Sequence, residues 1–150
     1  MTERLSFYKA SPAGTKLMIE VEKYLGECGL EPSLMHLVKM RASQINGCAY
    51  CLDMHSHDAR KIGETEQRLY VLDAWRETPL FSARERAALA WTEALTLISQ
   101  THAPDDAYEE AKAQFNEAEL ANLTLLIGTI NTWNRIAIGT RMPVKPRTAE

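Results

Sequence analysis

The sequence predicts an all-α fold in a single domain, on the basis of three observations. Apolar residues recur at helical spacing along most of the chain, no run of alternating apolar and polar residues predicts a sheet, and no internal repeat or linker divides the chain. The chain has 150 residues, of which 45% are apolar and 25% charged, a composition typical of one globular domain. We therefore predict one domain over residues 1–150, with its core at about residues 15–142.

Start and stop signals divide the chain into about six to seven helices between an irregular arm at residues 1–11 and a tail that Pro143 and Pro146 keep from being helical. The expected helices cover 12 to about 26, 32–46, about 48–63, 66–76, 82 to about 101, a short stretch up to 115, and 116 to about 138. Pro12 and Pro32 each suit the first position of a helix, and Asn46-Gly47 is a strong stop signal.

The later helices begin with capping boxes. Ser82 is followed three residues later by Glu85, and Asn116 is followed in the same way by Glu119. The last helix is apolar on most of its faces, so it either forms the centre of a monomer or packs partly against another copy of the chain. Within it, we expect Asn131, Trp133 and Asn134 to pack and to form hydrogen bonds between helices.

Charge and hydropathy exclude several classes of protein. The formal charge is −3 and the sequence pI is near 5.8, which argues against a nucleic-acid partner. No apolar stretch approaches the roughly 20 residues that cross a membrane. The first residues do not resemble a signal peptide, so we expect a cytoplasmic protein. In that reducing compartment, a pair of Cys residues is more often reactive or metal-binding than structural.

The segment with the strongest chemical signal contains Cys48, Cys51 and His55. Their spacings of three, four and seven residues place the three side chains on one face of a helix. Gly47 directly before them puts the Cys pair at the helix N-terminus, where unpaired N–H groups and the helix dipole favour thiolate over thiol, as a protonated imidazole would. This arrangement predicts a dithiol redox site.

Position along the helix assigns a role to each side chain. Cys51 is the expected nucleophile, because His55 lies one turn beyond it and can move its proton. Cys48, at the helix start, is expected nearer to solvent, where it would close the disulfide and later meet the reductant. His36 either folds back over the motif at the Gly47 turn or is an ordinary surface or interior histidine. Tyr50 either lines a substrate pocket or fills space.

Two alternatives compete with redox chemistry. Both Cys residues could be small buried apolar side chains. They could also bind zinc together with His55 and either His36 or His57, in a metal site or a redox sensor without turnover. The chain has no second closely spaced pair of metal ligands, so the sequence favours a dithiol enzyme without metal or other cofactor.

The run from Arg41 to His55 resembles the CxxCxxxH core of the AhpD-like, carboxymuconolactone decarboxylase superfamily, and residues 87–94 and 130–135 resemble its later helices. The resemblance covers about residues 15–142. It implies an all-helical fold, assembly into trimers or hexamers, and reduction of alkyl hydroperoxides by a dithiol at the expense of a thiol or dithiol reductant. The decarboxylase branch lacks the paired Cys, so the dithiol argues against lactone decarboxylation.

The resemblance also implies roles for single residues. Cys51 is the peroxidatic thiol, Cys48 resolves it, and His55 belongs to a proton relay. The Glu that completes this relay in the family falls at His36 here, and an imidazole passes protons without supplying a carboxylate's charge. Glu93 is a conceivable replacement for that carboxylate.

Overall fold

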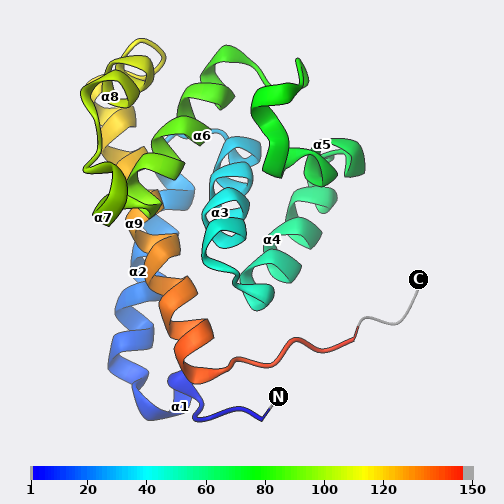
Figure 1. Ribbon diagram of the computed structural model, residues 1–150. Helices are drawn as coiled ribbons and strands as arrows, with labels where there is room; N and C mark the ends of the chain where they lie inside the picture. Colours follow the sequence, from blue (N-terminus) through cyan, green and yellow to red (C-terminus); the bar gives the residue numbers. More distant parts are fainter. Residues whose placement is uncertain (1, 147–150) are drawn as a thin grey trace.

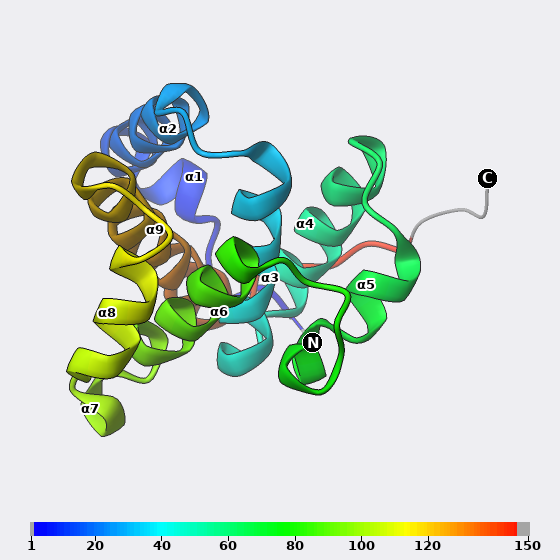
Figure 2. The ribbon, with the colours of Figure 1, turned by 90° about the horizontal axis from the view of Figure 1, so that it is seen from above.

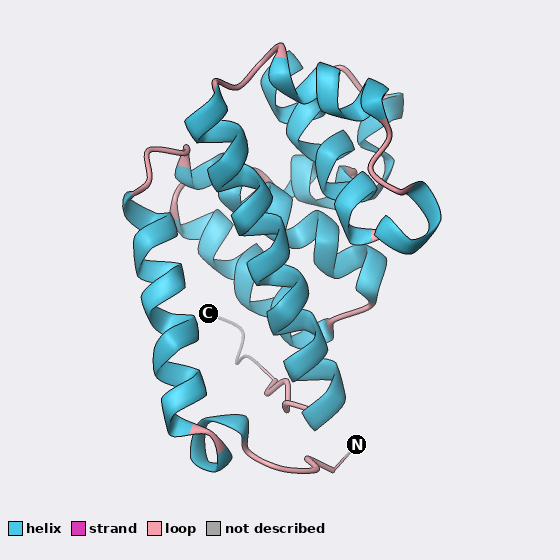
Figure 3. Cartoon of the chain, turned by 90° about the vertical axis from the view of Figure 1, so that its left-hand side faces the viewer, coloured by secondary structure: helices cyan, strands magenta, loops and turns pink. Residues whose placement is uncertain are grey.

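A computed structural model describes residues 2–146, and every regular element in that range is helical (Figure 3). The all-α prediction is therefore confirmed. The helices are α1 (Phe7–Ala10), α2 (Pro12–Glu27), α3 (Pro32–Asn46), α4 (Ala49–Lys61), α5 (Glu66–Tyr70), the 3₁₀ helix η1 (Leu72–Glu77), α6 (Ala83–Thr96), α7 (Ile98–Thr101), α8 (Asp105–Lys112) and α9 (Glu117–Thr140).

Local sequence signals fix most of the helix ends. Pro12 and Pro32 open α2 and α3 as predicted. The capping boxes of Ser82 with Glu85 and of Asn116 with Glu119 are both formed, at the starts of α6 and α9. The α9 helix, between Asn116 and its left-handed C-cap, has buried residues along its whole length, as expected of a core helix.

Gly47 makes the corner between α3 and α4. Its φ of 69° and ψ of 35° lie in the left-handed region, and its N–H bonds to the carbonyls of Ser43 and Gln44 at the end of α3. Cys48 follows as the N-cap of α4. This corner folds α4 back along α3, so that residues near the middle of α3 face residues of α4.

Three predicted boundaries are wrong. The arm at residues 1–11 contains the short helix α1. The helix expected over 66–76 divides into α5 and η1, and Ala74 inside η1 has non-helical angles of −107° and 32°. The helix from Ala83 ends at Thr96 instead of near Thr101, because Leu97 leaves helical geometry and α7 continues as a single turn.

Helix α3 lies at the centre of the molecule, packed against α4, α6 and α9 (Figures 1 and 2). One buried cluster joins α2, α3, α6, α8 and α9, and a second joins α3 and α4 to α5, η1 and α6. A third, smaller cluster contains the Cys pair with Ala42, Ile130 and Ala137. The Cys motif thus lies where α3, α4 and α9 meet.

The N-terminal segment is tied to the end of α9. The Arg4 N–H donates to the Thr140 carbonyl at 2.9 Å, and an Arg4 guanidinium nitrogen donates to the Gly139 carbonyl at 3.1 Å. Figure 1 shows the start of the chain and the end of α9 at the same end of the molecule. In the part of the chain that the structure describes, no helix has the length and apolar character to cross a membrane.

Candidate dithiol site

The two Cys side chains of the motif meet at the first turn of α4. Cys48 is the N-cap, and its sulfur accepts a hydrogen bond from the Cys51 N–H at 3.4 Å. The two sulfur atoms lie 2.6 Å apart, joined by a hydrogen bond, and both residues are free thiols. The predicted sharing of one helix face is therefore confirmed for this pair.

The two sulfurs differ in their access to a cavity. Cys48 and Cys51 are 1% and 2% exposed and pack in one cluster with Ala42, Ile130 and Ala137, but of the two it is Cys51 that lines a cavity of about 380 Å³. The expectation that Cys48 lies nearer to solvent is therefore wrong. Cys48 caps the first turn of α4 through its sulfur, while Cys51, one turn further on, lines the cavity.

The thiol pair titrates as a unit. The hydrogen bond from the Cys51 thiol lowers the pKa of Cys48 to about 7, against the effect of burial. The same hydrogen bond, together with burial and the charge on Cys48, raises the pKa of Cys51 above its usual range. The lowered pKa that the sequence predicts for a thiol at this helix start thus falls on Cys48. The first proton of the pair is therefore lost around pH 7, which leaves one negative charge on Cys48 and one proton on Cys51.

Asn131 and Asn134 of α9 form hydrogen bonds to α3 beside the thiol pair. Asn46 donates to the side-chain oxygens of Asn131 and Asn134, at 2.9 Å in each case, and Asn134 donates to the Ser43 hydroxyl at 3.0 Å. Asn134 also lowers the pKa of both thiols through hydrogen bonding. The prediction of interhelix hydrogen bonds from Asn131 and Asn134 is confirmed, and these bonds lock α9 to the α3–α4 corner.

The Gly47 corner brings His36 of α3 next to His55 of α4. Their ring centroids are 5.7 Å apart, and the Nδ1 atoms of both are buried without a hydrogen-bond partner among the described residues. Burial, then Lys39 and His36, lower the pKa of His55 to about 3, and burial followed by Lys39 also lowers the pKa of His36. This lowered pKa favours the neutral form of His55 at pH 7, so His55 adds no positive charge beside the thiols.

The cavity beside Cys51 has an ionisable side and an apolar side. The ionisable side carries the two histidines and the ion pair of Lys39 with Glu22, whose nitrogen and oxygen lie 2.6 Å apart. The rest of the cavity is lined by Tyr8, Ile19, Tyr50, Met54, Asp58, Trp133, Ala137 and Met142. The sequence did not single out Lys39 or Glu22, because neither lies in the motif and their pairing joins separate helices.

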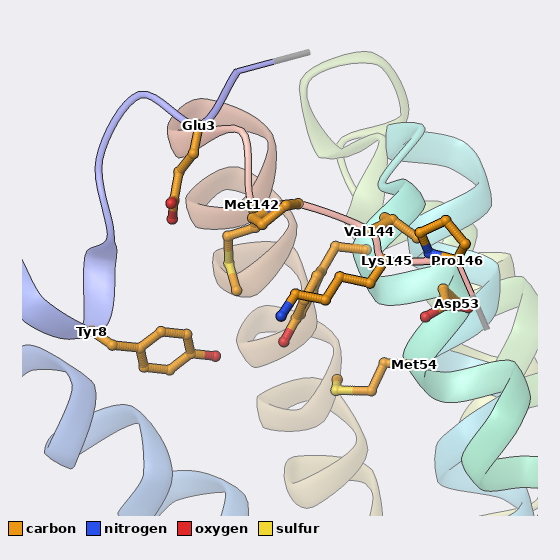
Figure 4. A pocket seen from close by; sticks show the side chains of 10 residues that line it. Glu3, Tyr8, Asp53, Met54, Met142, Val144, Lys145 and Pro146 are labelled. Carbon is orange, nitrogen blue, oxygen red and sulfur yellow. The ribbon is translucent and has the colours of Figure 1, made fainter. Parts of the chain in front are cut away.

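A second, more open cavity of about 520 Å³ adjoins the first. Figure 4 shows it between Tyr8 on one side, Asp53 and Met54 on another, and residues 142–146 across the top. Tyr50 lines both cavities, and burial followed by its neighbour Tyr8 raises the pKa of Tyr50. Tyr50 therefore lines a pocket, which is the first of the two roles that the sequence allowed for it.

Two other residues considered from the sequence lie elsewhere. His57 lines a separate surface hollow beside Arg60 and Tyr70. Glu93 accepts hydrogen bonds from Arg41 Nε and Trp75 Nε1, both at 2.8 Å, and from Arg76. Glu93 is absent from the lining of the Cys51 cavity, and its hydrogen bonds join α6 to α3 and η1. Within residues 2–146, no group of three or more His, Cys, Asp or Glu side chains is arranged to hold a metal ion.

Comparisons with known proteins agree with this geometry. The model of the carboxymuconolactone decarboxylase family matches residues 12–94, which include the whole Cys and His motif. The uncharacterised protein YdfG of Bacillus subtilis is 45% identical over 138 residues, which are 92% of this chain and 94% of YdfG.

Solved structures share the fold. The Agrobacterium tumefaciens protein ATU0492, of unknown function and named as a candidate antioxidant defence protein AhpD, is 46% identical with a TM-score of 0.92, over 96% of this chain and all of that one. The debrominase Bmp8 shares the fold at 18% identity, with a TM-score of 0.79 over 91% of this chain and 74% of Bmp8. The match to the family model and the near full-length similarity to YdfG and ATU0492 show that this chain belongs to the AhpD-like, carboxymuconolactone decarboxylase superfamily.

Proposed function

We propose that the protein is a dithiol peroxidase that reduces alkyl hydroperoxides through Cys51 and Cys48. The observation that carries the proposal is the pair of touching free thiols, one of which lines a cavity that it shares with two histidines. Reduction of a peroxide by two thiols needs a nucleophilic sulfur open to substrate and a second sulfur within bonding reach of the first. Cys51 and Cys48 meet these two conditions.

The reaction begins with one negative charge on the thiol pair. The proton between the sulfurs shifts to Cys48, and the Cys51 thiolate attacks the terminal oxygen of the hydroperoxide. The O–O bond breaks, the alkoxide takes a proton and leaves as an alcohol, and Cys51 becomes a sulfenic acid. Cys48 then attacks the Cys51 sulfur, hydroxide leaves with the Cys48 proton as water, and the disulfide forms.

The histidine pair suits the proton steps. A neutral imidazole accepts or passes a proton without first losing one, and His55 stays neutral far below pH 7. His36, whose ring lies beside that of His55, extends this path towards Lys39, Glu22 and Asp58 at the ionisable side of the cavity. The apolar side, with Met54 and Trp133, suits the alkyl group of the substrate.

The test is a thiol count on single variants. The wild-type protein loses two thiols per chain on treatment with an alkyl hydroperoxide. Cys51→Ser loses none, whereas Cys48→Ser stops at a Cys51 sulfenic acid, which dimedone traps. Cys28→Ser is the matched control, because Cys28 is a free thiol at the end of α2, remote from the motif in the chain, and it leaves turnover unchanged. An unchanged thiol count in the wild-type protein would refute the proposal.

Assembly and location complete the proposal. We infer a trimer or hexamer in the reducing cytoplasm, where a thiol or dithiol returns the disulfide to its reduced form. Exposed apolar side chains on α2, namely Leu17, Ile19 and Tyr24, give self-association a surface. Light scattering on the purified protein measures the mass directly, and a monomer at micromolar concentration would contradict this part of the proposal.

A further inference from the structure

We propose that the reductant attacks the disulfide at Cys51, through the same cavity as the peroxide, and that Cys48 is the sulfur that leaves. This inference rests on the proposed function and concerns its second half, the return of the disulfide to two thiols. It reverses the order that the motif alone suggests, in which Cys48 meets the reductant.

Access to the two sulfurs is the first argument. Both sulfurs are buried in one cluster with Ala42 of α3 and with Ile130 and Ala137 of α9, but Cys48 is not among the residues that line the cavity. Cys51 lines the cavity directly. A thiolate that enters through the cavity therefore meets Cys51, whereas Cys48 lines neither of the two cavities described above.

The fixed position of α9 strengthens this argument. Asn46 binds both Asn131 and Asn134, and Asn134 binds Ser43, all at 2.9–3.0 Å. Asn134 is fully buried, so opening α9 at this point would break several buried hydrogen bonds at once. Asn46, Asn131 and Asn134 therefore hold α9 in place against the thiol pair.

The direction of attack is the second argument. Exchange at a disulfide proceeds with the incoming sulfur, the attacked sulfur and the leaving sulfur nearly in line. Because Cys51 lines the cavity and Cys48 does not, a molecule in the cavity meets the Cys51 sulfur first. An approach through the cavity thus presents Cys51 as the attacked sulfur and Cys48 as the leaving one.

The leaving sulfur is the third argument. Cys48 caps α4, so its sulfur accepts the Cys51 N–H at 3.4 Å and lies at the positive end of the helix dipole. Both contacts stabilise negative charge on Cys48, in agreement with the lowered pKa of this thiol. Because a more stable thiolate leaves faster, exchange at Cys51 is also the chemically favoured direction.

The step balances as follows. The reductant thiolate forms a bond to Cys51, the Cys48–Cys51 bond breaks, and Cys48 leaves as a thiolate. A second thiol of the reductant then attacks its own sulfur in this mixed disulfide. Cys51 is released as a thiolate that takes a proton, and the reductant leaves as a disulfide.

The test uses Cys28→Ser protein, so that the motif thiols are the only two present. Diamide first oxidises the pair to the disulfide without any peroxide. A brief pulse of 2-mercaptoethanol follows, then acid, then N-ethylmaleimide, and peptide mass spectrometry locates the two labels. The expected product carries mercaptoethanol on Cys51 and maleimide on Cys48, in at least tenfold excess over the opposite product. An excess of mercaptoethanol on Cys48 would overturn the inference.

Single-Cys proteins provide a second measurement. Cys28→Ser with Cys48→Ser leaves Cys51, and Cys28→Ser with Cys51→Ser leaves Cys48. With hydroxyethyl disulfide as the probe, in excess of the thiol, Cys51 alone forms the mixed disulfide at least tenfold faster per thiolate than Cys48 alone; equal rates contradict the route through the cavity. Failure of diamide to form any disulfide contradicts the proposed function itself, whereas a disulfide that opens at Cys48 contradicts the entry route alone.

Discussion

Replacing Glu93 with Gln tests whether this carboxylate stabilises the fold or works at the thiol site. Glu93 lies on α6, and its side chain is 17% exposed. It accepts hydrogen bonds from Arg41 and Trp75 at 2.8 Å and from Arg76. Gln keeps the shape but removes the charge, and it turns an N–H₂ group towards donors. We expect a loss of stability and no loss of peroxidase turnover per folded molecule.

The size of the loss follows from the three contacts. Hydrogen bonds to a charged group contribute about 1.5–3 kcal/mol each when buried. The Arg76 side chain is 54% exposed, so its pairing adds little, and Gln retains one acceptor oxygen for either Arg41 or Trp75. The free energy of unfolding should fall by about 3 kcal/mol, which for a chain of this size lowers Tm by roughly 6–12 °C.

The assay is urea unfolding followed by circular dichroism at pH 7 and at acidic pH. Although burial alone would raise the pKa of Glu93, hydrogen bonds from Trp75, Arg76 and Arg41 lower it overall. A carboxylate with a depressed folded-state pKa stabilises the fold fully above its unfolded pKa of about 4.3, and that stabilisation is lost as the pH falls through the folded value. The gap between wild type and Glu93→Gln should therefore close below about pH 4.

Asp73→Asn is the matched control, because Asp73 binds the same Arg41 at 2.6 Å but is 75% exposed. Its loss should stay below about 1 kcal/mol. Two results would refute the reasoning: equal losses for Glu93→Gln and Asp73→Asn, or a Glu93→Gln protein that is as stable as wild type but has lost turnover. The second would place Glu93 in the proton relay.

Two further predictions concern the α3–α4 corner. Gly47→Ala should destabilise the fold by about 1–2 kcal/mol. Gly47 has a φ of 69° and open space around an added Cβ, so backbone strain is the main cost of the substitution. The control is Gly26→Ala, in helical backbone with equal space, which should be neutral or stabilising by up to about 1 kcal/mol. Urea midpoints measure both, and equal effects would contradict the strain at Gly47. His55→Gln should weaken the loss of unfolding free energy at acidic pH. The lowered pKa of His55, about 3, means that below about pH 6.5 the unfolded chain binds a proton that the folded chain does not. The wild-type free energy of unfolding should therefore fall by about 1.4 kcal/mol per pH unit from this residue as the pH drops from 6.5 towards 3. Unfolding titrations at several pH values measure the slope, and identical slopes in the two proteins would count against a neutral buried His55.

Local signals in the sequence predicted much of the fold. Capping boxes and prolines at first helical positions depend on a few adjacent residues, so they located the starts of α2, α3, α6 and α9 correctly. The breaks at Ala74 and Leu97 were missed, because single residues leave helical geometry there inside runs that keep helical apolar spacing. Helix starts were thus more predictable than helix ends.

The site was predictable only in part, for the same reason. Spacing placed Cys48 and Cys51 together because both lie in one turn. Both sulfurs pack against Ile130 and Ala137, which lie 79 to 89 residues later in the chain, and it is Cys51 that lines the cavity in the folded protein. The neutral state of His55 likewise results from burial by other helices and from the charge on Lys39. Such effects arise from tertiary packing and leave no local pattern.

Both ends of the described chain line the two cavities next to the thiol pair. Glu3, Tyr8 and residues 142–146 border the cavities next to the thiols, and Arg4 fastens the leading segment to α9. Trimming these ends would remove part of the lining of both cavities together with the Arg4 hydrogen bonds to the end of α9. An affinity tag fused beside them would sit at the edge of these cavities, so tests of the proposed activity call for tag-free protein or a tag inserted in the α4–α5 turn at Gly63.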